Sequence, residues 1–314
     1  MDIFEEDMPC PEKNENAMNR QYFTIAGITV CVESDTDSGR IEFSKKFNSF
    51  RVAGKGEDNV VLRHYFNMPE IKGRYLGKEV YRKVPWAVYR KGREWIYLGI
   101  TRQESNERLF RIAVFNDGYT CGKIYDNPIE KETLYEGGKS ALSFFPTDQV
   151  WLAPLLADRK AFFLHSSAAI LNGQGLIFVG HSEAGKSTTL KMLKGKAEIL
   201  CDDRNILRRW DDGWRVHGTW SHGELPYVSS SSAKLTAVLI LKQDRCNKIV
   251  RMIDRREIWK KLLVTLIKPM VTAEWWMKEL DALELLVKEV PVLTMHFDKS
   301  GEIVEELEKL DKKK

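Results

Sequence analysis

Residues 180–188 read GHSEAGKST, which has the residue types and spacing of a phosphate-binding loop. An apolar run at residues 176–179 predicts a buried strand before it, and residues 187–193 predict a helix after it. In that arrangement, backbone N–H groups and the helix N-terminus form a positive cradle for a triphosphate. The residues predicted to bind the nucleotide are Gly180, Ser182, Gly185, Lys186, Ser187 and Thr188. Among them, Lys186 is expected to reach the β- and γ-phosphates, and the Ser187 hydroxyl to coordinate Mg²⁺.

A histidine is expected to approach this loop from the preceding strand. The dipeptide Asn-Gly at positions 172–173 lies between two apolar runs, which is the strongest short signal for a β-hairpin. The strand before the loop should therefore have an antiparallel partner immediately upstream. A two-residue turn brings His165 opposite Gly180, and a four-residue turn brings it opposite Ser182. With either register, His165 reaches the mouth of the phosphate site, and we predict a functional role for it.

Two adjacent carboxylates, Asp202 and Asp203, follow the strand expected at residues 197–201. Carboxylates at a strand end near a phosphate loop are an expected source of a further Mg²⁺ contact and of a general base. Adjacent carboxylates repel unless a cation or a hydrogen-bond donor lies beside them. A solvated turn is the alternative interpretation. Taken together with the loop, the pair predicts Mg²⁺ ligands and a base.

A polar loop at residues 218–224 (GTWSHGE) follows a strand-like run at residues 214–217. Read alone it is a turn, but it could bring Ser221, His222 or Glu224 towards a transferred group, and we predict a catalytic role for Glu224. Three basic residues further on could balance phosphate charge or form a solvated face: Lys242, Arg245 and Lys248.

The elements that must position these residues suggest three parts of the chain. Residues 1–20 are polar and predict a disordered arm. Residues 21–146 contain short alternating segments and glycine turns, which predict a β-rich accessory or recognition domain. Aromatic residues on a hairpin expected at residues 88–97 could be a ligand platform, although cross-strand packing is favoured. Residues 147–314 predict an α/β nucleotide-binding domain that begins with a short helix.

Two amphipathic helices are expected in the last part, at residues 254–267 and 273–288. Their apolar stripes should face the core. The stripe residues are Ile258, Leu262 and Leu266 in the first helix, and Trp276, Leu280, Leu283 and Val287 in the second. A strand at residues 292–297 and a final helix complete the pattern.

Composition narrows the class of protein. A chain of 314 residues with 43% hydrophobic residues is long enough for two packed domains. The net charge of +4 comes from nearly balanced acids and bases, which argues against a nucleic-acid partner. Five cysteines without regular spacing predict a reducing compartment. Acidic first residues and the lack of an apolar stretch of about 18 residues predict a cytoplasmic protein without a membrane partner. Homo-oligomer formation is left open.

The chemistry-bearing segments together resemble the HPr kinase family, of the phosphoenolpyruvate-carboxykinase-like group of phosphate-loop proteins. The resemblance is carried by residues 165–167 (HSS), 180–188 and 201–203 (CDD). The loop at residues 218–224 is similar to that of uncharacterised HPr-kinase-related proteins, some of whose relatives accompany peptide natural-product clusters and phosphorylate a serine of a precursor peptide. The resemblance covers roughly residues 151–310. It implies an α/β phosphate-loop domain of this type, preceded by a smaller β-rich α+β domain.

Carried over to this sequence, the resemblance implies ATP and Mg²⁺ as cofactors. Asp202 would activate an acceptor hydroxyl with support from His165, Asp203 and Ser187 would hold Mg²⁺, and Lys186 would bind the phosphates. The implied function is an ATP-dependent kinase that transfers the γ-phosphate to a serine or threonine of a peptide or protein, or to a small molecule. The alternative is a nucleotide-binding regulatory or adaptor protein with weak or no kinase activity. The intact lysine, serine and aspartates favour the enzyme.

Overall fold

The computed structural model of the chain describes residues 19–34, 45–65, 68–69, 76–103, 106–126, 148–268 and 272–310. The chain is mixed α/β, with most of its regular structure in strands that form two sheets. Two units divide it, Met1–Leu155 and Leu156–Lys314. Of the arm expected at residues 1–20, residues 1–18 lie outside the described residues, and the last two belong to the first strand. Among the described residues, no helix combines the length and the apolar character that spanning a bilayer requires.

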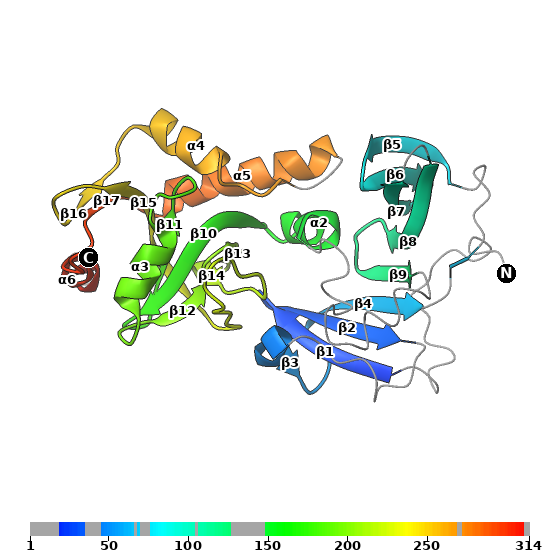
Figure 1. Ribbon diagram of the computed structural model, residues 1–314, viewed down its shortest axis with the longest axis horizontal. Coiled ribbons are helices and arrows are strands. Elements are labelled where there is room, and N and C mark those ends of the chain that lie inside the picture. Colours follow the sequence, from blue (N-terminus) through cyan, green and yellow to red (C-terminus); the bar gives the residue numbers. More distant parts are fainter. Residues whose placement is uncertain are drawn as a thin grey trace. The chain divides into compact units, whose positions relative to one another are not determined.

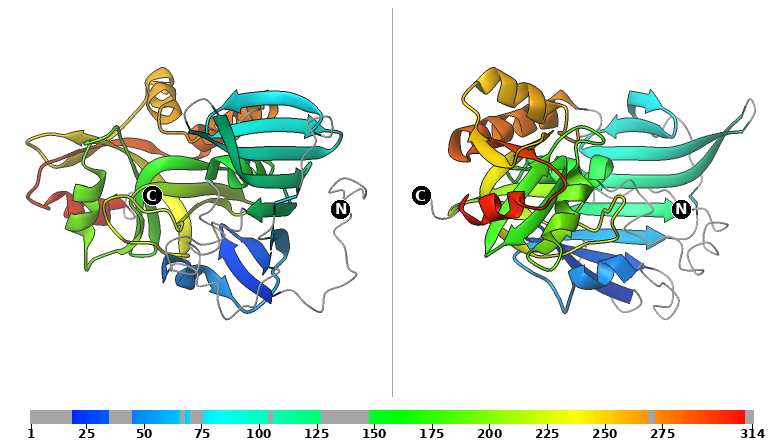
Figure 2. Two further views of the ribbon diagram at one scale, coloured as in Figure 1. Left: turned by 45° about the vertical axis from the view of Figure 1, so that its right-hand side comes forward. Right: turned by 60° about the vertical axis from the view of Figure 1, so that its left-hand side comes forward.

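The first unit contains a nine-stranded sheet in the order β3-β1-β2-β4-β9-β8-β7-β6-β5. Only β2–β4 and β4–β9 are parallel pairs in it. Figure 2 shows these strands, blue to teal, side by side. The elements are β1 (Asn19–Ile25), β2 (Ile28–Ser34), η2 (Lys45–Phe50), β3 (Arg51–Val52), β4 (Asp58–Tyr65), β5 (Lys78–Lys83), β6 (Trp86–Lys91), β7 (Glu94–Gln103), β8 (Asn106–Asn116) and β9 (Cys121–Asp126).

The aromatic hairpin of the first unit is formed by β6 and β7. Trp95 and Tyr97 are buried, and the Tyr97 hydroxyl lies 2.6 Å from that of Tyr119. Burial raises the pKa of Tyr119 well above its ordinary value. These two hairpin aromatics therefore pack inside the unit, in line with the cross-strand interpretation.

The second unit is built on an eight-stranded sheet in the order β11-β10-β13-β14-β15-β17-β16, with β12 paired to β10 and β11 also paired to β15. Its elements, with the η4 and α2 helices at the boundary between the units, are shown in Figure 1. They are η4 (Asp148–Leu152), α2 (Ala153–Ala157), β10 (Ala161–Leu171), β11 (Gln174–Val179), α3 (Lys186–Leu193), β12 (Glu198–Cys201), β13 (Arg204–Trp210), β14 (Gly213–His217), β15 (Ser232–Gln243), β16 (Lys248–Arg251), α4 (Arg255–Leu263), α5 (Ala273–Glu289), β17 (Val292–Phe297) and α6 (Ile303–Glu308).

The hairpin between β10 and β11 has the two-residue turn that the sequence predicts. Asn172 and Gly173 have φ values of 51° and 78°, the left-handed conformation that a type I′ turn needs at both positions. Leu171 pairs with Gln174, and the register continues to the pair Ser166–Val179. The four-residue alternative is therefore wrong. This ladder ends one residue before His165, which pairs with Arg204 of β13.

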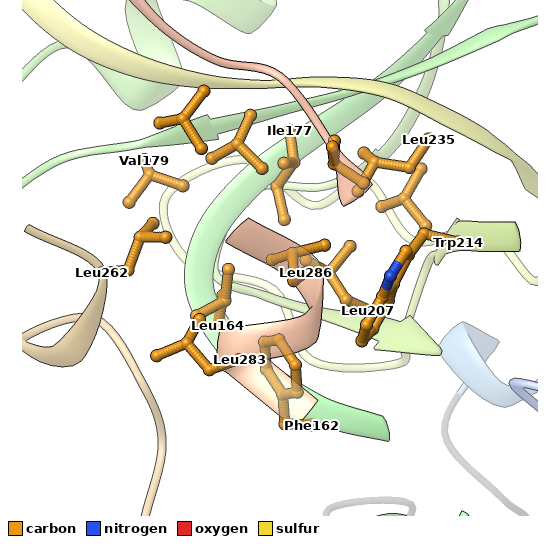
Figure 3. Packing of buried hydrophobic residues seen from close by; sticks show 14 of the residues in the cluster. Phe162, Leu164, Ile177, Val179, Leu207, Trp214, Leu235, Leu262, Leu283 and Leu286 are labelled. Carbon is orange, nitrogen blue, oxygen red and sulfur yellow. The ribbon is translucent and has the colours of Figure 1, made fainter. Parts of the chain in front are cut away.

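Strand β11 is covered on both faces, which explains its unbroken apolar sequence. Ile177 and Val179 face a core that includes residues of α4 and α5, whereas Leu176 and Phe178 face a core that includes α3 and α6. Figures 1 and 2 show α4 and α5 on one side of these strands, and Figure 3 shows the packing around Ile177 and Val179. The strand has an antiparallel neighbour in β10 and a parallel one in β15, so the segment that follows it starts from a rigid base.

The first amphipathic helix ends earlier than predicted, at Leu263 instead of residue 267. The N–H of His165 donates to Thr265 O at 2.7 Å, and the N–H of Ile267 donates to Phe163 O at 3.1 Å. Pairing with β10 thus replaces the last helical turn. Ile258, Leu262 and Leu266 are nevertheless buried as expected.

The second amphipathic helix occupies nearly the predicted range, but its buried face differs in part from the predicted stripe. Trp276, Leu280 and Val287 are only partly covered, and Leu283 alone of the predicted set is fully buried. Trp276 and Val287 nevertheless pack against the core that contains Leu283, so the prediction holds for three of the four stripe residues. What it did not include is the glutamate on the inward face. The buried residues of α5 are Trp275, Glu279, Ala282, Leu283 and Leu286.

Candidate functional site

The glycine-rich segment between β11 and α3 makes a tight turn that only small residues permit. A Cβ atom on Gly180 would lie 2.5 Å from the Cβ of Ala184. Gly185 has φ +102°, and a Cβ there would lie 2.7 Å from the Phe297 ring. Its carbonyl accepts the Thr189 N–H at 2.8 Å, which begins the hydrogen bonding of α3. The first N–H groups of α3 are therefore directed into the turn, as anion binding requires.

Lys186, the first residue of α3, folds back over this turn. Its Nζ donates to Gly180 O at 3.0 Å and to His181 O at 3.1 Å. The residue is buried, and desolvation lowers its pKa, an effect that the nearby Asp203 carboxylate opposes. An ammonium group that exchanges two carbonyl contacts for phosphate oxygens needs no rearrangement of the backbone. Lys186 is thus placed where an incoming phosphate would meet it.

His165 is paired with Asp203, the second of the two adjacent carboxylates. The His165 Nδ1 atom lies 3.1 Å from Asp203 Oδ1, and the Arg204 Nε atom lies 3.2 Å from Asp203 Oδ2. The hydrogen bond with His165 lowers the pKa of Asp203, and the charges of Arg204 and Lys186 act in the same direction. Asp203 is therefore a half-buried carboxylate that the His165 imidazole, the Arg204 guanidinium and the Lys186 ammonium group keep ionised.

Asp202 has a different environment. Its Oδ1 accepts the Gly223 N–H at 2.7 Å, and its Oδ2 accepts the Leu225 N–H at 2.6 Å. The residue is 4% exposed. A Cβ on Gly223 would lie 3.4 Å from Asp202 Oδ2, so the glycine allows this close approach. Both oxygens of Asp202 thus hold the loop that the sequence predicted at residues 218–224.

The same loop brings one of its predicted residues, Glu224, to helix α3, which follows the glycine-rich turn at residues 180–185 (the phosphate turn). The Glu224 carboxylate lies 2.9 Å from Lys191 Nζ, and hydrogen bonds from Lys191 and Ser187 lower its pKa. His222 bonds only weakly, at 3.3 Å, to the carbonyl of its neighbour Gly223. The Ser221 carbonyl accepts from the buried Cys201 thiol, whose pKa burial raises to about 11. Glu224 is therefore the loop side chain that reaches α3.

Two residues of this site gave no signal in the sequence. Arg204 pairs with Asp203, as described. Asn205 is fully buried, and its Nδ2 donates to Ser166 O at 2.8 Å and to Cys201 O at 3.3 Å. Asn205 thus fixes β10 against the strand end that carries the aspartates. For Arg204 the available clue was its place directly after the twin aspartates, because adjacent carboxylates favour a cation beside them.

Two hollows flank the phosphate turn. One, of about 710 Å³, is lined by His181, Glu183, Lys242, Gln243 and His296 among others. The second, of about 210 Å³, is bounded by residues of α3, β15 and β17, namely Gly185, Thr188, Gln243, Asp244, Phe297, Asp298 and Lys299. Of the three basic residues proposed to balance phosphate charge, Lys242 borders the larger hollow, and all three are solvent-exposed.

The predicted residues therefore fall into two groups. In the first group, at the N-terminus of α3, Lys186 interacts with the charge of Asp203, which is paired with His165. Ser187 of the same helix is hydrogen-bonded to Glu224. The carboxylate of Asp202 points instead into the backbone of the 218–225 loop. The oxygen donors in the first group are a hydroxyl and carboxylates, which are ligands that Mg²⁺ prefers, so this set fits the ion predicted from the sequence.

These features define a mixed α/β protein whose second unit presents a glycine-rich turn with a lysine and an ionised carboxylate. A family model described as "SynChlorMet cassette protein ScmC" matches residues 151–312, which is more than half of the chain. The chain belongs to this family. Among solved structures, the HPr(Ser) kinase/phosphatase from Coxiella burnetii is similar to it at 11% identity, with 48% of this chain and 93% of that chain covered and a TM-score of 0.28. No curated protein matches the chain.

Proposed function

We propose that the chain is an ATP-dependent kinase that transfers the γ-phosphate to a hydroxyl group of a peptide, a protein or a small molecule. The observation that carries the proposal is the cluster around Asp203, in which an ionised carboxylate lies beside Lys186 and is oriented by His165. Phosphoryl transfer requires positioned cations for the phosphates and a group that accepts the proton of the acceptor. The motif resemblance at residues 165–167, 180–188 and 201–203 supports the same reaction class.

In this proposal Lys186 leaves its two carbonyl partners and neutralises phosphate charge, while the N–H groups at the start of α3 hold the phosphate oxygens. The acceptor oxygen forms a bond to the γ-phosphorus as the bond from that phosphorus to the departing ADP breaks. The acceptor proton passes to the carboxylate of Asp203. His165 and Arg204 fix the orientation of that carboxylate.

We assign the proton-accepting role to Asp203 instead of Asp202, which the sequence resemblance favoured. Both oxygens of Asp202 already accept backbone N–H groups, and the side chain is nearly inaccessible. The oxygen donors that we assign to Mg²⁺ are the Ser187 hydroxyl and the Glu224 carboxylate, which are in contact with each other. When bound, the ion would neutralise charge on the transferred phosphate.

The nucleotide's base and sugar have an adjacent place to bind. The hollow of about 210 Å³ begins at Gly185 and Thr188, next to the phosphate turn, and includes the Phe297 ring. An aromatic wall and nearby polar groups are typical of small-molecule sites. This arrangement supports a nucleoside triphosphate as the phosphate donor.

The test is phosphate transfer from γ-labelled ATP and Mg²⁺ to a panel of serine- and threonine-containing peptides, with alanine versions of the same peptides as acceptor controls. We expect label on the hydroxyl peptides with the wild-type chain and its loss with Asp203→Asn. Asp211→Asn, an exposed aspartate in a turn of the same unit, is the matched control and should transfer normally. Label released only as inorganic phosphate, at equal rates in all variants, would overturn the kinase proposal and favour the regulatory alternative.

A further inference from the structure

A thiol, an imidazole and a carboxylate meet beside strand β16, at one edge of the sheet of the second unit. Asp244 follows β15, Cys246 lies in the connection to β16, and His296 is the penultimate residue of β17. Their ligand atoms all lie within 4.8 Å of one another. The His296 Nδ1 and Asp244 Oδ2 atoms are 2.8 Å apart.

Strand order explains why these residues converge. β17 lies between β15 and β16, and His296 pairs with Lys242 of β15 on one side and with Lys248 of β16 on the other. The connection at residues 244–247 must therefore cross the end of β17. The Asp244 N–H donates to Phe297 O at 2.9 Å, which fixes the start of that crossing.

The crossing is also fixed at its far side. The Asn247 Nδ2 donates to Asp298 Oδ1 at 3.1 Å, and the Asp298 N–H donates back to Asn247 Oδ1 at 3.2 Å. Cys246 lies between these two anchored positions, so its thiol is held near the imidazole by the backbone. A ligand cluster on an anchored turn is pre-organised, which favours metal binding.

We propose that Asp244, Cys246 and His296 form a binding site for a divalent transition-metal ion of the zinc type. Thiolate and imidazole are ligands that zinc prefers and that magnesium does not, so this site differs chemically from the oxygen donors near Ser187. The donors of a tetrahedral zinc site lie about 3.3–3.8 Å apart, given its metal–ligand distances. The three ligand atoms lie within 4.8 Å of one another, and the Asp244 side chain is 36% accessible, so it is free to turn towards an ion.

Charge and access support the same assignment. Thiolate and carboxylate together supply two negative charges, which match a divalent cation. Three protein ligands leave one tetrahedral position open to water or to a further ligand. Asp244 is exposed and Cys246 and His296 are partly exposed, so solvent reaches the cluster.

The experiment uses the full-length, reduced chain without nucleotide, so its outcome does not depend on the kinase proposal. Co²⁺ serves as a spectroscopic substitute for Zn²⁺, and the readout is a thiolate-to-cobalt absorption band that Zn²⁺ then abolishes. We expect one ion per chain. Cys246→Ser, His296→Gln and Asp244→Asn should each weaken binding by at least about tenfold, as ligand-sphere changes do.

Matched controls are Cys10→Ser, which removes another thiol, and His222→Gln, which removes an exposed imidazole elsewhere in the unit. Both should bind the metal as the wild type does. Circular dichroism spectra are recorded to check that every variant is folded. No thiolate band in the wild type would mean that Asp244 and His296 form a hydrogen-bonded pair only. A band that persists in Cys246→Ser, or that disappears in Cys10→Ser, would equally overturn the proposal.

Discussion

Two acidic side chains of the second unit are partly or fully buried, but their pKa values shift in opposite directions. At the phosphate turn, Asp203 is surrounded by His165, Arg204 and Lys186, and these groups lower its pKa. On the inward face of α5, Glu279 is fully buried, and neither of its carboxylate oxygens has a hydrogen-bond partner among the described residues. Desolvation raises the pKa of Glu279 to about 9.

The difference shows that burial alone does not identify a functional carboxylate. Burial without a partner disfavours the charged form, so Glu279 is a neutral acid at neutral pH that weakens the fold as pH rises. Burial beside cations favours the charged form, so Asp203 remains ionised over the whole neutral range. Substitutions at the two sites should therefore affect different properties, and four experiments test that contrast.

The largest effect is expected from Asp203→Asn. An amide cannot accept the acceptor's proton, and we expect the transfer rate to fall by roughly 10³-fold with nucleotide binding retained. Because the folded-state pKa of Asp203 is lowered, its ionised form persists above pH 3.8, and wild-type activity should decline only in acid. Rates measured from pH 4 to pH 9, with nucleotide affinity measured in parallel, check this. A variant with normal transfer would remove Asp203 from the chemistry.

A smaller effect, on stability instead of rate, is expected from Glu279→Met. The folded-state pKa is raised from 4.5 to about 9, so the native state binds more protons than the unfolded state between these values. The stability contributed by protonated Glu279 is complete below about pH 4.5 and is lost as pH rises towards 9, by up to about 1.4 kcal/mol per pH unit. We expect the methionine variant to be more stable at pH 7 by about 2–3 kcal/mol.

Denaturant unfolding at several pH values measures this gain. Glu284→Gln is the control, because Glu284 is exposed on the same helix and paired with Lys288. Because Lys288 lowers the pKa of Glu284, this variant should leave the pH dependence of stability unchanged from neutral pH to pH 9. If Glu279→Met keeps the wild-type slope, Glu279 is not the origin of that slope. The transfer rate should be unaffected in both variants.

Asp202→Asn separates the two adjacent aspartates. An amide group has one oxygen to accept where the carboxylate uses two, so the loop at residues 218–225 should lose a charge-assisted hydrogen bond and about 1.5–3 kcal/mol of stability. Transfer should fall less than in Asp203→Asn. Thermal unfolding and rate are measured together. Abolished transfer with unchanged stability would return the base role to Asp202, as the sequence resemblance implied.

The smallest effect is expected from Glu224→Gln. Its carboxylate is exposed and meets Ser187 and Lys191 in solvent. We expect a few-fold increase in the Mg²⁺ concentration needed for half-maximal transfer, with stability unchanged. Titration of Mg²⁺ at fixed ATP checks this. Glu198→Gln is the control, because Glu198 is an exposed glutamate of strand β12.

Local sequence rules were sufficient for much of the framework. The Asn-Gly dipeptide specified the turn between β10 and β11 because both positions need a positive φ, and the register of the hairpin as far as Ser166 and Val179 followed from it. The strand at residues 292–297 was predicted with the bounds that β17 has. In these segments local conformation and packing favour the same structure.

Choices between neighbouring residues were not accessible from the sequence. Consecutive residues at a strand end point in different directions, so the Asp-Asp dipeptide did not indicate which carboxylate would meet His165 and which would meet the backbone. The buried face of α5 was predicted only in part, for a related reason. A glutamate was not expected in the core, and only tertiary packing turned Glu279 inward.

One contact joins the glycine-rich turn after β11 to the end of the neighbouring strand β15. The Gln243 amide donates to the carbonyl of Glu183 at 2.7 Å, and Glu183 has a left-handed φ of 67°. Gln243 directly precedes Asp244. A single side chain therefore links the end of β15 to the turn that contains Glu183. If a ligand bound on one side of Gln243 displaces this amide, it changes the affinity for a ligand on the other side. Thermodynamic reciprocity requires the same factor in both directions.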